Sequence, residues 1–326
     1  MTTSSRPLVL ALLLGVAAAA PICRESLAQE FPTHAIRLYA GVGAGGIVDI
    51  LGRTVAEPMS KILGQPVIVE TKTGAGGLLA FEYVSRQPPD GYNIALGTQS
   101  LTTARAFVKD LRFDPVKDLV PLTVMAEGPA VLTAAIGAPY NTFQELVNYG
   151  KANPDKVTIG VPGAQSVPAL WWYAITQREG IKAIFVPYKG GTAVYAAQYA
   201  NEVQLGNPDI GRGIEDIKAG KVKGLAVTGL KRSPELPGIP STQELGHPEV
   251  GTFWLSLNVA AGTPKPIFDK LVAAARSALA DPAVVAFIRK SNLQPLALGP
   301  TESLKKLADE EGEFTEIARK AGIQPQ

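Results

Sequence analysis

The stretch YAGVGAGGIVDILGR, residues Tyr39 to Arg53, decides how the rest of the chain is interpreted. An apolar run ends in glycines here, and a helical pattern begins directly after them. Gly41, Gly43 and Gly46 match the G-x-G-x-x-G fingerprint of dinucleotide-binding proteins, and Glu70 closes the next apolar run where a ribose-binding carboxylate belongs. The glycines would also suit a different anion. The stretch therefore leaves two interpretations open, a nicotinamide enzyme or a binding site for another anionic ligand.

Short apolar runs alternate with helix-period segments along almost the whole chain. The runs predicted to be strands are residues 36–40, 67–70, 93–97, 122–126, 157–160, 183–187, 203–206 and 224–228. Long helical patterns cover 48–63, 142–153 and 266–280, and a capping box from Thr142 to Glu145 opens the second of them. Strands that alternate with helices through short Gly and Pro turns are typical of parallel sheets covered on both faces. The sequence predicts an α/β fold.

The N-terminus has the pattern of a secretory signal. Arg6 precedes an apolar run, 7–20, that is too short to span a bilayer comfortably, and the small residues Ser26 and Ala28 stand where a cleavage site requires them. We expect residues 1–28 to be removed on export. Cys23 is the only cysteine of the chain. The mature protein would then have none, which excludes disulfides, thiolate metal sites and a cysteine nucleophile.

Composition narrows the class of protein further. The chain is 46% hydrophobic and 18% charged, which suits a folded globular protein rather than a disordered one. The net charge is +2 and no basic stripe stands out, which argues against nucleic acid as a partner. A chain of about 300 residues usually divides into two domains. No Gly/Ser linker separates them here, so we expect two domains joined by crossing strands.

The tetrapeptide GAGG occurs twice, at Gly43–Gly46 and at Gly74–Gly77, each time between a predicted strand and a helical segment. Without Cβ atoms, the backbone N–H groups of such loops can point together at one anion, and the positive end of a helix dipole adds to the attraction. Loops that follow neighbouring strands meet at the carboxyl ends of those strands. Neither loop continues into Gly-Lys-Ser/Thr, and an exported protein meets no ready supply of nicotinamide cofactor. The two loops therefore favour an anionic ligand and no cofactor.

Longer blocks of sequence fall in the order seen in a known family. They are FPTHAIRL, GAGGIVDILGR, LGQPVIVETKTGAGG, PPDGYNIALGT, FDPVKDLVPLTVMA, VPYKGG, IKAGKVKGLAVTGLKRSPELPGIPSTQELG and AAGTPKPIFDKL. With these blocks the chain resembles the Bug (TctC-like) family, the extracytoplasmic solute-binding receptors of tripartite tricarboxylate transporters. The resemblance covers nearly the whole chain after residue 28.

The resemblance implies a type II periplasmic-binding fold of two α/β lobes. One lobe would comprise residues 29–130 with 253–326, and the other residues 131–252. Between them the lobes would enclose a small carboxylate in the periplasm. The closed receptor, which we expect to be a monomer, would then be presented to integral-membrane subunits of the transporter.

The resemblance also implies which residues face the ligand. Its carboxylate would be held by backbone N–H groups of the two glycine loops: Gly43, Ala44, Gly45, Gly46, Gly74, Ala75, Gly76 and Gly77. The remaining contacts would come from Thr98, Gln99, Ser100, Gln165, Ser166, Val167, Tyr188, Lys189, Asn207 and Asp209, with Ser166 and the N–H of Val167 at the far end of the ligand. The chain departs from the family pattern in three places: Gly43-Ala44 replaces a usual Pro-Pro, Ala169 replaces a histidine, and Pro208 aligns with an aspartate. The resemblance therefore does not say which carboxylic acid is bound, or whether it has one carboxylate or two.

The roles of two tryptophans and one lysine can each be interpreted in two ways. Trp171 or Trp172 could stack on an aromatic acid such as terephthalate, or both could belong to the core. Adjacent helix positions point about 100° apart, so at most one of the two would face the cleft. Lys189 could pair with a carboxylate or lie only at the surface of its turn.

Catalysis finds little support in the sequence. Neither H-E-x-x-H nor G-x-S-x-G is present, and His34 and His247 are both expected at the surface without a partner nucleophile. The adjacent acids Glu310 and Glu311 fall on an amphipathic C-terminal helix, where we expect a solvated face. An exported hydrolase is the alternative enzyme interpretation. We expect a binding protein with neither a catalytic group nor a metal.

Overall fold

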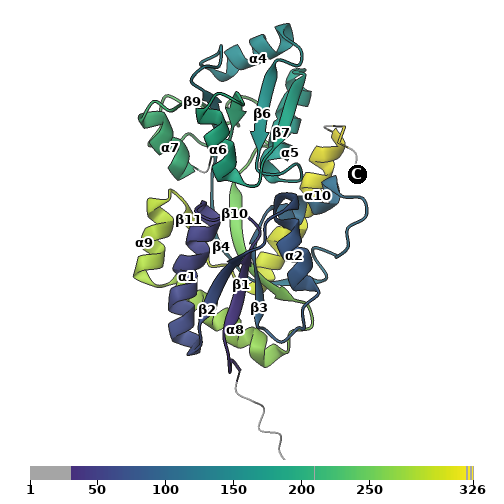
Figure 1. Ribbon diagram of the computed structural model, residues 1–326, viewed down its shortest axis with the longest axis vertical. Coiled ribbons are helices and arrows are strands. Elements are labelled where there is room, and N and C mark those ends of the chain that lie inside the picture. Colours follow the sequence, from purple (N-terminus) through teal and green to yellow (C-terminus); the bar gives the residue numbers. More distant parts are fainter. Residues whose placement is uncertain (1–30, 209, 321, 324, 326) are drawn as a thin grey trace, which may run out of the picture.

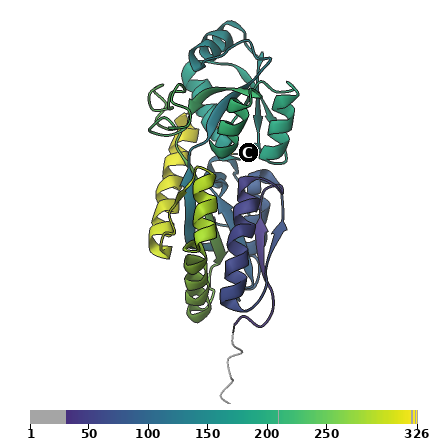
Figure 2. The ribbon, with the colours of Figure 1, turned by 90° about the vertical axis from the view of Figure 1, so that its left-hand side faces the viewer.

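The computed structural model describes residues 31–208, 210–320, 322, 323 and 325. The predicted signal, residues 1–28, and Asp209 lie outside the described residues. Figure 1 shows two α/β lobes, one above the other, each built around one sheet. Figure 2 shows the same two lobes from the side, with helix α10 (Pro300–Lys320) running along the lower lobe and reaching the upper one.

The lower lobe contains a six-stranded sheet with the strand order β11-β4-β10-β3-β1-β2. Its strands are β1 (Ile36–Ala40), β2 (Val67–Thr71), β3 (Asn93–Thr98), β4 (Leu119–Gly128), β10 (Phe253–Ala260) and β11 (Gln294–Pro295). Strand β1 pairs in parallel with β2 and β3, whereas β10 runs antiparallel to both β3 and β4. The helices of this lobe are α1 (Ile47–Leu63), the short 3-10 turn η1 (Ala75–Gly77), α2 (Leu78–Ser85), α3 (Ser100–Phe107), α8 (Lys265–Leu279), α9 (Pro282–Lys290) and α10.

The upper lobe contains a five-stranded sheet with the order β7-β6-β8-β5-β9. Its strands are β5 (Val131–Ala135), β6 (Val157–Val161), β7 (Ala183–Pro187), β8 (Leu205–Gly206) and β9 (Val222–Val227). Strands β7, β6 and β8 are parallel, and β5 runs antiparallel to β8 and β9. The helices are α4 (Phe143–Ala152), α5 (Val167–Glu179), α6 (Gly191–Tyr199) and α7 (Ile210–Lys218).

The α/β class is confirmed, and the expectation of parallel sheets holds for only part of each sheet. Strands β4, β5 and β10, which stand where the chain passes between the lobes, are all antiparallel to neighbours. The capping box also differs in detail. Glu145 N–H donates to Thr142 Oγ1 at 3.2 Å, but the Glu145 carboxylate accepts from the N–H of Asn141, one residue before the N-cap.

Helix α1 buries one face against the lower sheet, and this fixes where its first turn lies. Its buried apolar side chains recur at helical spacing: Val48, Leu51, Val55, Met59 and Leu63. A Cβ atom on Gly52 would lie 2.7 Å from Leu96 Cδ2 of β3, so the glycine lets the helix approach the sheet closely.

Among the described residues no single helix is long and apolar enough to cross a membrane; α8 and α9 meet that criterion only together, as a pair bent by 65°.

His247 is buried, so the prediction that it lies at the surface is wrong. Only 1% of the residue is exposed. Its Nε2 lies 3.0 Å from Glu179 Oε1 and its Nδ1 lies 3.2 Å from Glu249 Oε1. Burial alone would raise the pKa of Glu249, but the hydrogen bond with His247 and the charge of Arg178 lower it. His34, in contrast, is exposed and stacks on Tyr92, as a surface residue should.

The two chain segments that cross between the lobes are joined to each other by hydrogen bonds. The first joins β4 to β5 around Ala130, and the second begins at Thr228 after β9 and leads to β10. The N–H of Ala130 donates to Thr228 Oγ1 at 2.8 Å, and the N–H of Thr228 donates to the carbonyl of Ala130 at 2.9 Å. Thr228 is 1% exposed, so these bonds are shielded from water.

We predict that Thr228→Val lowers the free energy of unfolding by about 1–3 kcal/mol. Valine has the shape of threonine but leaves the buried N–H of Ala130 without an acceptor, and an unpaired buried donor costs this much. Urea denaturation of both proteins measures the difference. Thr315→Val is the matched control, because the exposed Thr315 hydroxyl only donates to the Glu311 carbonyl of its own helix. Equal stability of the parent and Thr228→Val would contradict the prediction.

Candidate functional site

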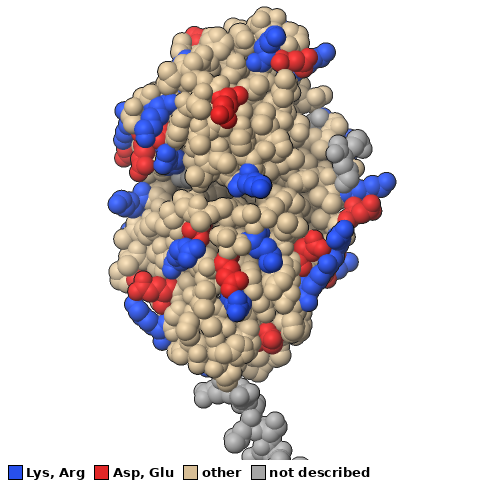
Figure 3. All heavy atoms as spheres, in the orientation of Figure 1, with Lys and Arg blue, Asp and Glu red and all other residues tan. Residues whose placement is uncertain are grey.

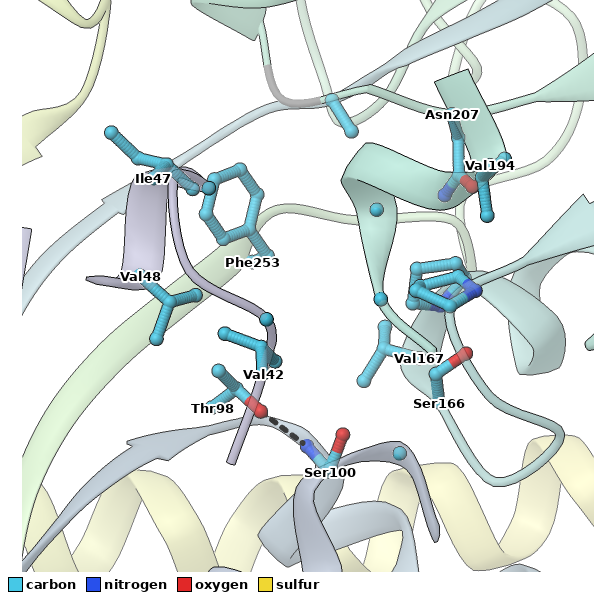
Figure 4. Close-up of a pocket in the computed structure, with 18 of the residues that line it drawn as sticks. Val42, Ile47, Val48, Thr98, Ser100, Ser166, Val167, Val194, Asn207 and Phe253 are labelled. Carbon is cyan, nitrogen blue, oxygen red and sulfur yellow. Dashed lines mark hydrogen bonds between the residues drawn. The ribbon is translucent and has the colours of Figure 1, made fainter. Parts of the chain in front are cut away.

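A cavity of about 160 Å³ lies between the two lobes. Its walls are the loops that follow the parallel strands of both sheets, so it occupies the position where α/β proteins place their ligands. Figure 3 shows the surface hollowed between the lobes. Figure 4 shows the interior, with Val42, Ile47 and Phe253 on one side and Val194 and Asn207 on the other.

The structure brings most of the predicted site residues to this cavity. Those that line it are Gly43, Gly46, Gly76, Thr98, Gln99, Ser100, Ser166, Val167, Lys189 and Asn207. A second hollow, which shares Gly76 and Lys189 with the first, is lined by Gly74, Ala75, Gly77, Gln165 and Tyr188. Neither hollow is lined by Ala44 or Gly45.

Sequence reasoning missed the apolar part of the wall. Val42, Ile47, Val48, Val194 and Phe253 all line the cavity. Three of them flank the first glycine loop directly, and their positions just before and after it could have identified them. Phe253 opens strand β10, and only the way that β10 crosses between the lobes places it here.

Four helices begin at the cavity wall. The N-cap residues of α1, α3, α5 and α6 are Gly46, Gln99, Ser166 and Gly190, and each of them lines the cavity. The N-terminus of a helix has a partial positive charge and free backbone donors. Among the described residues that line the cavity there is no Asp or Glu, and Lys189 is the only Lys or Arg. The electrostatics of the cavity therefore favour an anion.

One glycine of the first loop has a different role from the one expected. The N–H of Gly45 donates to Asp49 Oδ2 at 3.0 Å, and Asp49 Oδ1 in turn accepts from Arg53 Nε at 3.0 Å. Burial raises the pKa of Asp49, but the bonds from Arg53 and Gly45 lower it below the usual value. Asp49 therefore remains ionised and holds the loop in shape. The Gly45 N–H is occupied by this bond instead of pointing at a ligand.

The two lobes meet through glycines at the edge of the cavity. A Cβ atom on Gly163 of the upper lobe would lie 2.7 Å from Gly76 Cα of the lower lobe, and one on Gly190 would lie 3.3 Å from Gly43 N. Thr103 Oγ1 of α3 also donates to the carbonyl of Gln165 at 3.2 Å. Backbone approaches backbone at these points, so the two lobes are in direct contact at the edge of the cavity.

Two hydroxyl groups of the wall form hydrogen bonds within their own loops. Ser166 Oγ donates to the Gly163 carbonyl at 2.7 Å and accepts from the N–H of Ala169 at 3.4 Å, which caps α5. Thr98 Oγ1 accepts from the N–H of Ser100 at 3.3 Å (Figure 4). Ser166 can thus offer a ligand an acceptor but not its hydroxyl proton.

Comparison with known proteins places this geometry in a family. The family profile described as "Tripartite tricarboxylate transporter family receptor" matches residues 51–323. The chain belongs to this receptor family. A relative from Bordetella pertussis, described as a UPF0065 protein, is 33% identical over 301 residues, which cover 92% of this chain and 93% of the relative. The resemblance noted in the sequence is thereby confirmed.

Solved structures of similar proteins confirm the fold of the receptor. Periplasmic binding protein BugD is 30% identical with a TM-score of 0.86, and the match covers 91% of this chain and 100% of BugD. Two structures at 26% identity and a TM-score of 0.83 have named ligands: a protein of R. palustris with adipate, and MatC of Rhodopseudomonas palustris with bound malate. These matches cover 91% and 88% of this chain and 100% of each neighbour. The receptor therefore has the two-lobed periplasmic-binding fold, in a family of periplasmic binding proteins rather than enzymes.

The two adjacent tryptophans of the receptor differ in whether they line the cavity. Trp171 lines the cavity, whereas Trp172 does not. Both belong to the same apolar core of the upper lobe and are at most 1% exposed. The expectation that at most one of them faces the cleft is confirmed, and core packing applies to both.

Gln99 connects the cavity of the receptor to helix α10. Its Nε2 donates to the carbonyl of Thr252 at 2.9 Å and to Glu310 Oε2 at 3.4 Å. Glu310 also accepts from Trp254 Nε1 at 2.5 Å and pairs with Lys306 at 2.9 Å. The prediction of a solvated acidic face is therefore wrong for Glu310. Burial raises its pKa, although the charge of Lys306 and these hydrogen bonds act in the opposite direction.

Glu311 is not on a free acidic face either. Its side chain is 18% exposed and accepts from Arg105 Nε at 2.5 Å, and Arg105 also pairs with Asp114 at 2.8 Å. The two adjacent acids thus bind α10 to different parts of the lower lobe. Among the described residues no group of three or more His, Cys, Asp or Glu is placed to hold a metal ion.

We predict that Lys306→Met destabilises the receptor by about 2 kcal/mol at pH 7, between the values for exposed and fully buried ion pairs. The substitution leaves the Glu310 carboxylate buried without its cation and raises the pKa of Glu310 further. A protonated Glu310 needs no cation, so the loss should shrink as the pH falls through that raised pKa.

Urea denaturation at several pH values measures this loss. Lys305→Met is the matched control, because Lys305 pairs with Asp309 at the same i,i+4 spacing while both side chains are more than half exposed. Its cost should stay below about 0.5 kcal/mol. A loss that is the same for both variants, or that grows as the pH falls, would show that Glu310 is not a buried carboxylate stabilised by Lys306.

Proposed function

We propose that the receptor captures a small carboxylate between its lobes and delivers it, in the closed form, to integral-membrane subunits of a tripartite tricarboxylate transporter. One observation carries this proposal. Four helix N-termini converge on the cavity, and none of the described residues that line it is acidic. Such a cavity attracts an anion without needing a buried counter-charge. Adipate and malate, named in two structural neighbours, are carboxylates of this kind.

The size of the cavity supports a small ligand. A cavity of about 160 Å³ is close to the engineered cavity of about 150 Å³ that binds benzene. An aliphatic or aromatic acid with one or two carboxylates fits this volume, whereas a dinucleotide is several times larger. The match of Gly41, Gly43 and Gly46 to the dinucleotide fingerprint is thus better explained by a carboxylate loop.

Closure gives the binding its mechanism. Only the closed arrangement lets groups of both lobes contact one ligand, so the ligand stabilises the closed state by its additional contacts there. We place the lobe boundaries at 130/131 and 252/253, within the two bonded crossing segments. Export through removal of residues 1–28, a periplasmic location and a monomeric receptor belong to the same proposal.

A thermal-shift screen over aliphatic and aromatic carboxylic acids tests the proposed function. An acid at 100 times its Kd should add about 2.7 kcal/mol to the free energy of unfolding. The amide analogue of the same acid should add much less, because it lacks the charge that the helix N-termini favour. If no carboxylate stabilises the protein, or if acid and amide act equally, the proposed function is wrong. Turnover of a bound acid would instead point to an enzyme.

We predict that Gly76→Val weakens carboxylate binding at least tenfold. Its Cβ atom would lie 3.2 Å from Gln165 C and Ser166 N of the opposite lobe, so the larger side chain keeps the lobes apart. Loss of one charge-assisted hydrogen bond already accounts for a factor of ten. Titration calorimetry with the tightest acid of the screen measures the change.

The control for Gly76→Val is Gly64→Val. Gly64 has nearly the same left-handed backbone, φ +71° and ψ +11° against φ +65° and ψ +16° for Gly76, but nothing lies within 4 Å of its Cβ position. Both variants should lose stability through backbone strain, and only Gly76→Val should lose affinity. Equal affinities in the two variants would mean that close approach at Gly76 does not matter for binding.

A further inference from the structure

The wall of the cavity contains polar atoms that are buried and unpaired. Within the described residues, five buried side-chain atoms have no hydrogen-bond partner, and three of them belong to residues that line the cavity: Gln99 Oε1, Trp171 Nε1 and Asn207 Nδ2. Buried polar groups in folded proteins nearly always have a partner. We therefore expect whatever fills the cavity to supply partners for these atoms.

Two of these atoms lie on the upper lobe and are hydrogen-bond donors. Trp171 comes from the N-terminal part of α5 and is 1% exposed, and Asn207 directly follows β8 and is 9% exposed. Figure 4 shows the side chain of Asn207 extending into the cavity beside Val194. An indole N–H can only donate, and an amide nitrogen also donates. Both groups therefore require an acceptor.

A ligand in the cavity can supply that acceptor, because no described group of the protein pairs with either atom. The neighbouring side chains Val167 and Val194 are apolar. The third unpaired atom, Gln99 Oε1, is itself an acceptor and belongs to the lower lobe, where its Nε2 is held by Thr252. In Figure 4, Val42 and Ile47, which flank the first glycine loop, stand across the cavity from Asn207.

We infer that Trp171 and Asn207 form a donor pair that recognises an oxygen atom on the end of the ligand far from its first carboxylate. This inference rests on the proposed function, in which the lower-lobe glycine loops hold that first carboxylate. It assigns the ligand to the acids that have a second oxygen group: dicarboxylates, oxo acids and hydroxy acids. The indole N–H of Trp171, not the face of its ring, makes the contact.

The donor pair selects by exclusion as well as by attraction. An acid of the same length without the second oxygen group leaves two buried N–H groups unpaired when the lobes close. Sites built to bond a polar group reject analogues that lack it far more strongly than apolar pockets reject a missing methylene. We expect the parent protein to prefer the acid with two oxygen groups by about a hundredfold or more.

Matched pairs of acids measure this preference. Succinate is compared with butyrate, adipate with hexanoate, and terephthalate with 4-methylbenzoate. The tightest acid of the screen is also compared with its analogue that lacks the second oxygen group. Asn207→Asp keeps the shape of the side chain but replaces the donor with a carboxylate, and Trp171→Phe removes the N–H. Each should reduce the preference at least tenfold. Trp171→Phe should weaken only the acid with two oxygen groups, whereas the added carboxylate of Asn207→Asp should weaken both acids, and the one with an oxygen beside it far more.

Trp172→Phe is the matched control. Trp172 Nε1 is also buried and unpaired, but Trp172 does not line the cavity. This variant should lose stability and keep the parent's ratio of the two affinities. Calorimetry gives both affinities for each folded variant, so a general loss of stability cannot be mistaken for lost recognition.

The outcomes separate the inference from the proposed function. Loss of the preference in Asn207→Asp and Trp171→Phe, with Trp172→Phe unchanged, supports the donor pair. A tightest acid without a second oxygen group, or an unchanged preference in Asn207→Asp and Trp171→Phe, overturns the donor pair and leaves the carboxylate receptor standing. If the parent binds no carboxylate, both the inference and the proposed function fail.

Discussion

The site depends on places where backbone approaches backbone and no Cβ atom fits. Within the lower lobe, a Cβ on Gly41 would lie 2.7 Å from Gly77 Cα, so the first two loops touch each other. Between the lobes, Gly163 meets Gly76 just as closely. Gly41 and Gly163 follow β1 and β6 and precede α1 and α5, two of the helices whose N-termini face the cavity, whereas Gly76 and Gly77 precede α2. A side chain at Gly41, Gly76 or Gly163 would separate the loops and with them the positive helix ends that make the cavity suitable for an anion.

The contact between the lobes is linked to the crossing segments by one buried polar network. Gln99 forms part of the cavity wall, while its amide donates to the carbonyl of Thr252 in the second crossing segment and to Glu310 of α10. Glu310 also accepts from Trp254, at the start of β10. A movement of the crossing segments would therefore displace a residue of the wall. Because the Glu310 carboxylate is buried, its hydrogen bonds cannot be exchanged for hydrogen bonds to water without a cost in free energy.

Local patterns in the sequence predicted most of the elements and much of the cavity wall. Eight strands, the long helical patterns and both glycine loops follow from periodicity and from the positions of glycine, which are properties of short segments. Strands β5, β10 and β11 were not predicted. What failed depends on partners far away in the chain. Glu310 accepts a hydrogen bond from Gln99, 211 residues earlier, and His247 contacts Glu179, 68 residues earlier. The bond from the N–H of Gly45 to Asp49 is local, but it depends on the backbone path of the loop, which the residue types alone did not reveal.

The position of α10 has a consequence for the order in which the protein can fold. Near its beginning, Ser303 Oγ accepts from the N–H of Val124 in the lower sheet. Near its end, Phe314 and Ile317 belong to the apolar core that also contains Trp171 of the upper lobe. Domains generally fold as their sequence is synthesised, beginning from the N-terminus. Here the upper lobe, although made of the middle of the chain, lacks part of its core until the last residues arrive. The C-terminal part of α10 must therefore be in place before this lobe can reach its final packing.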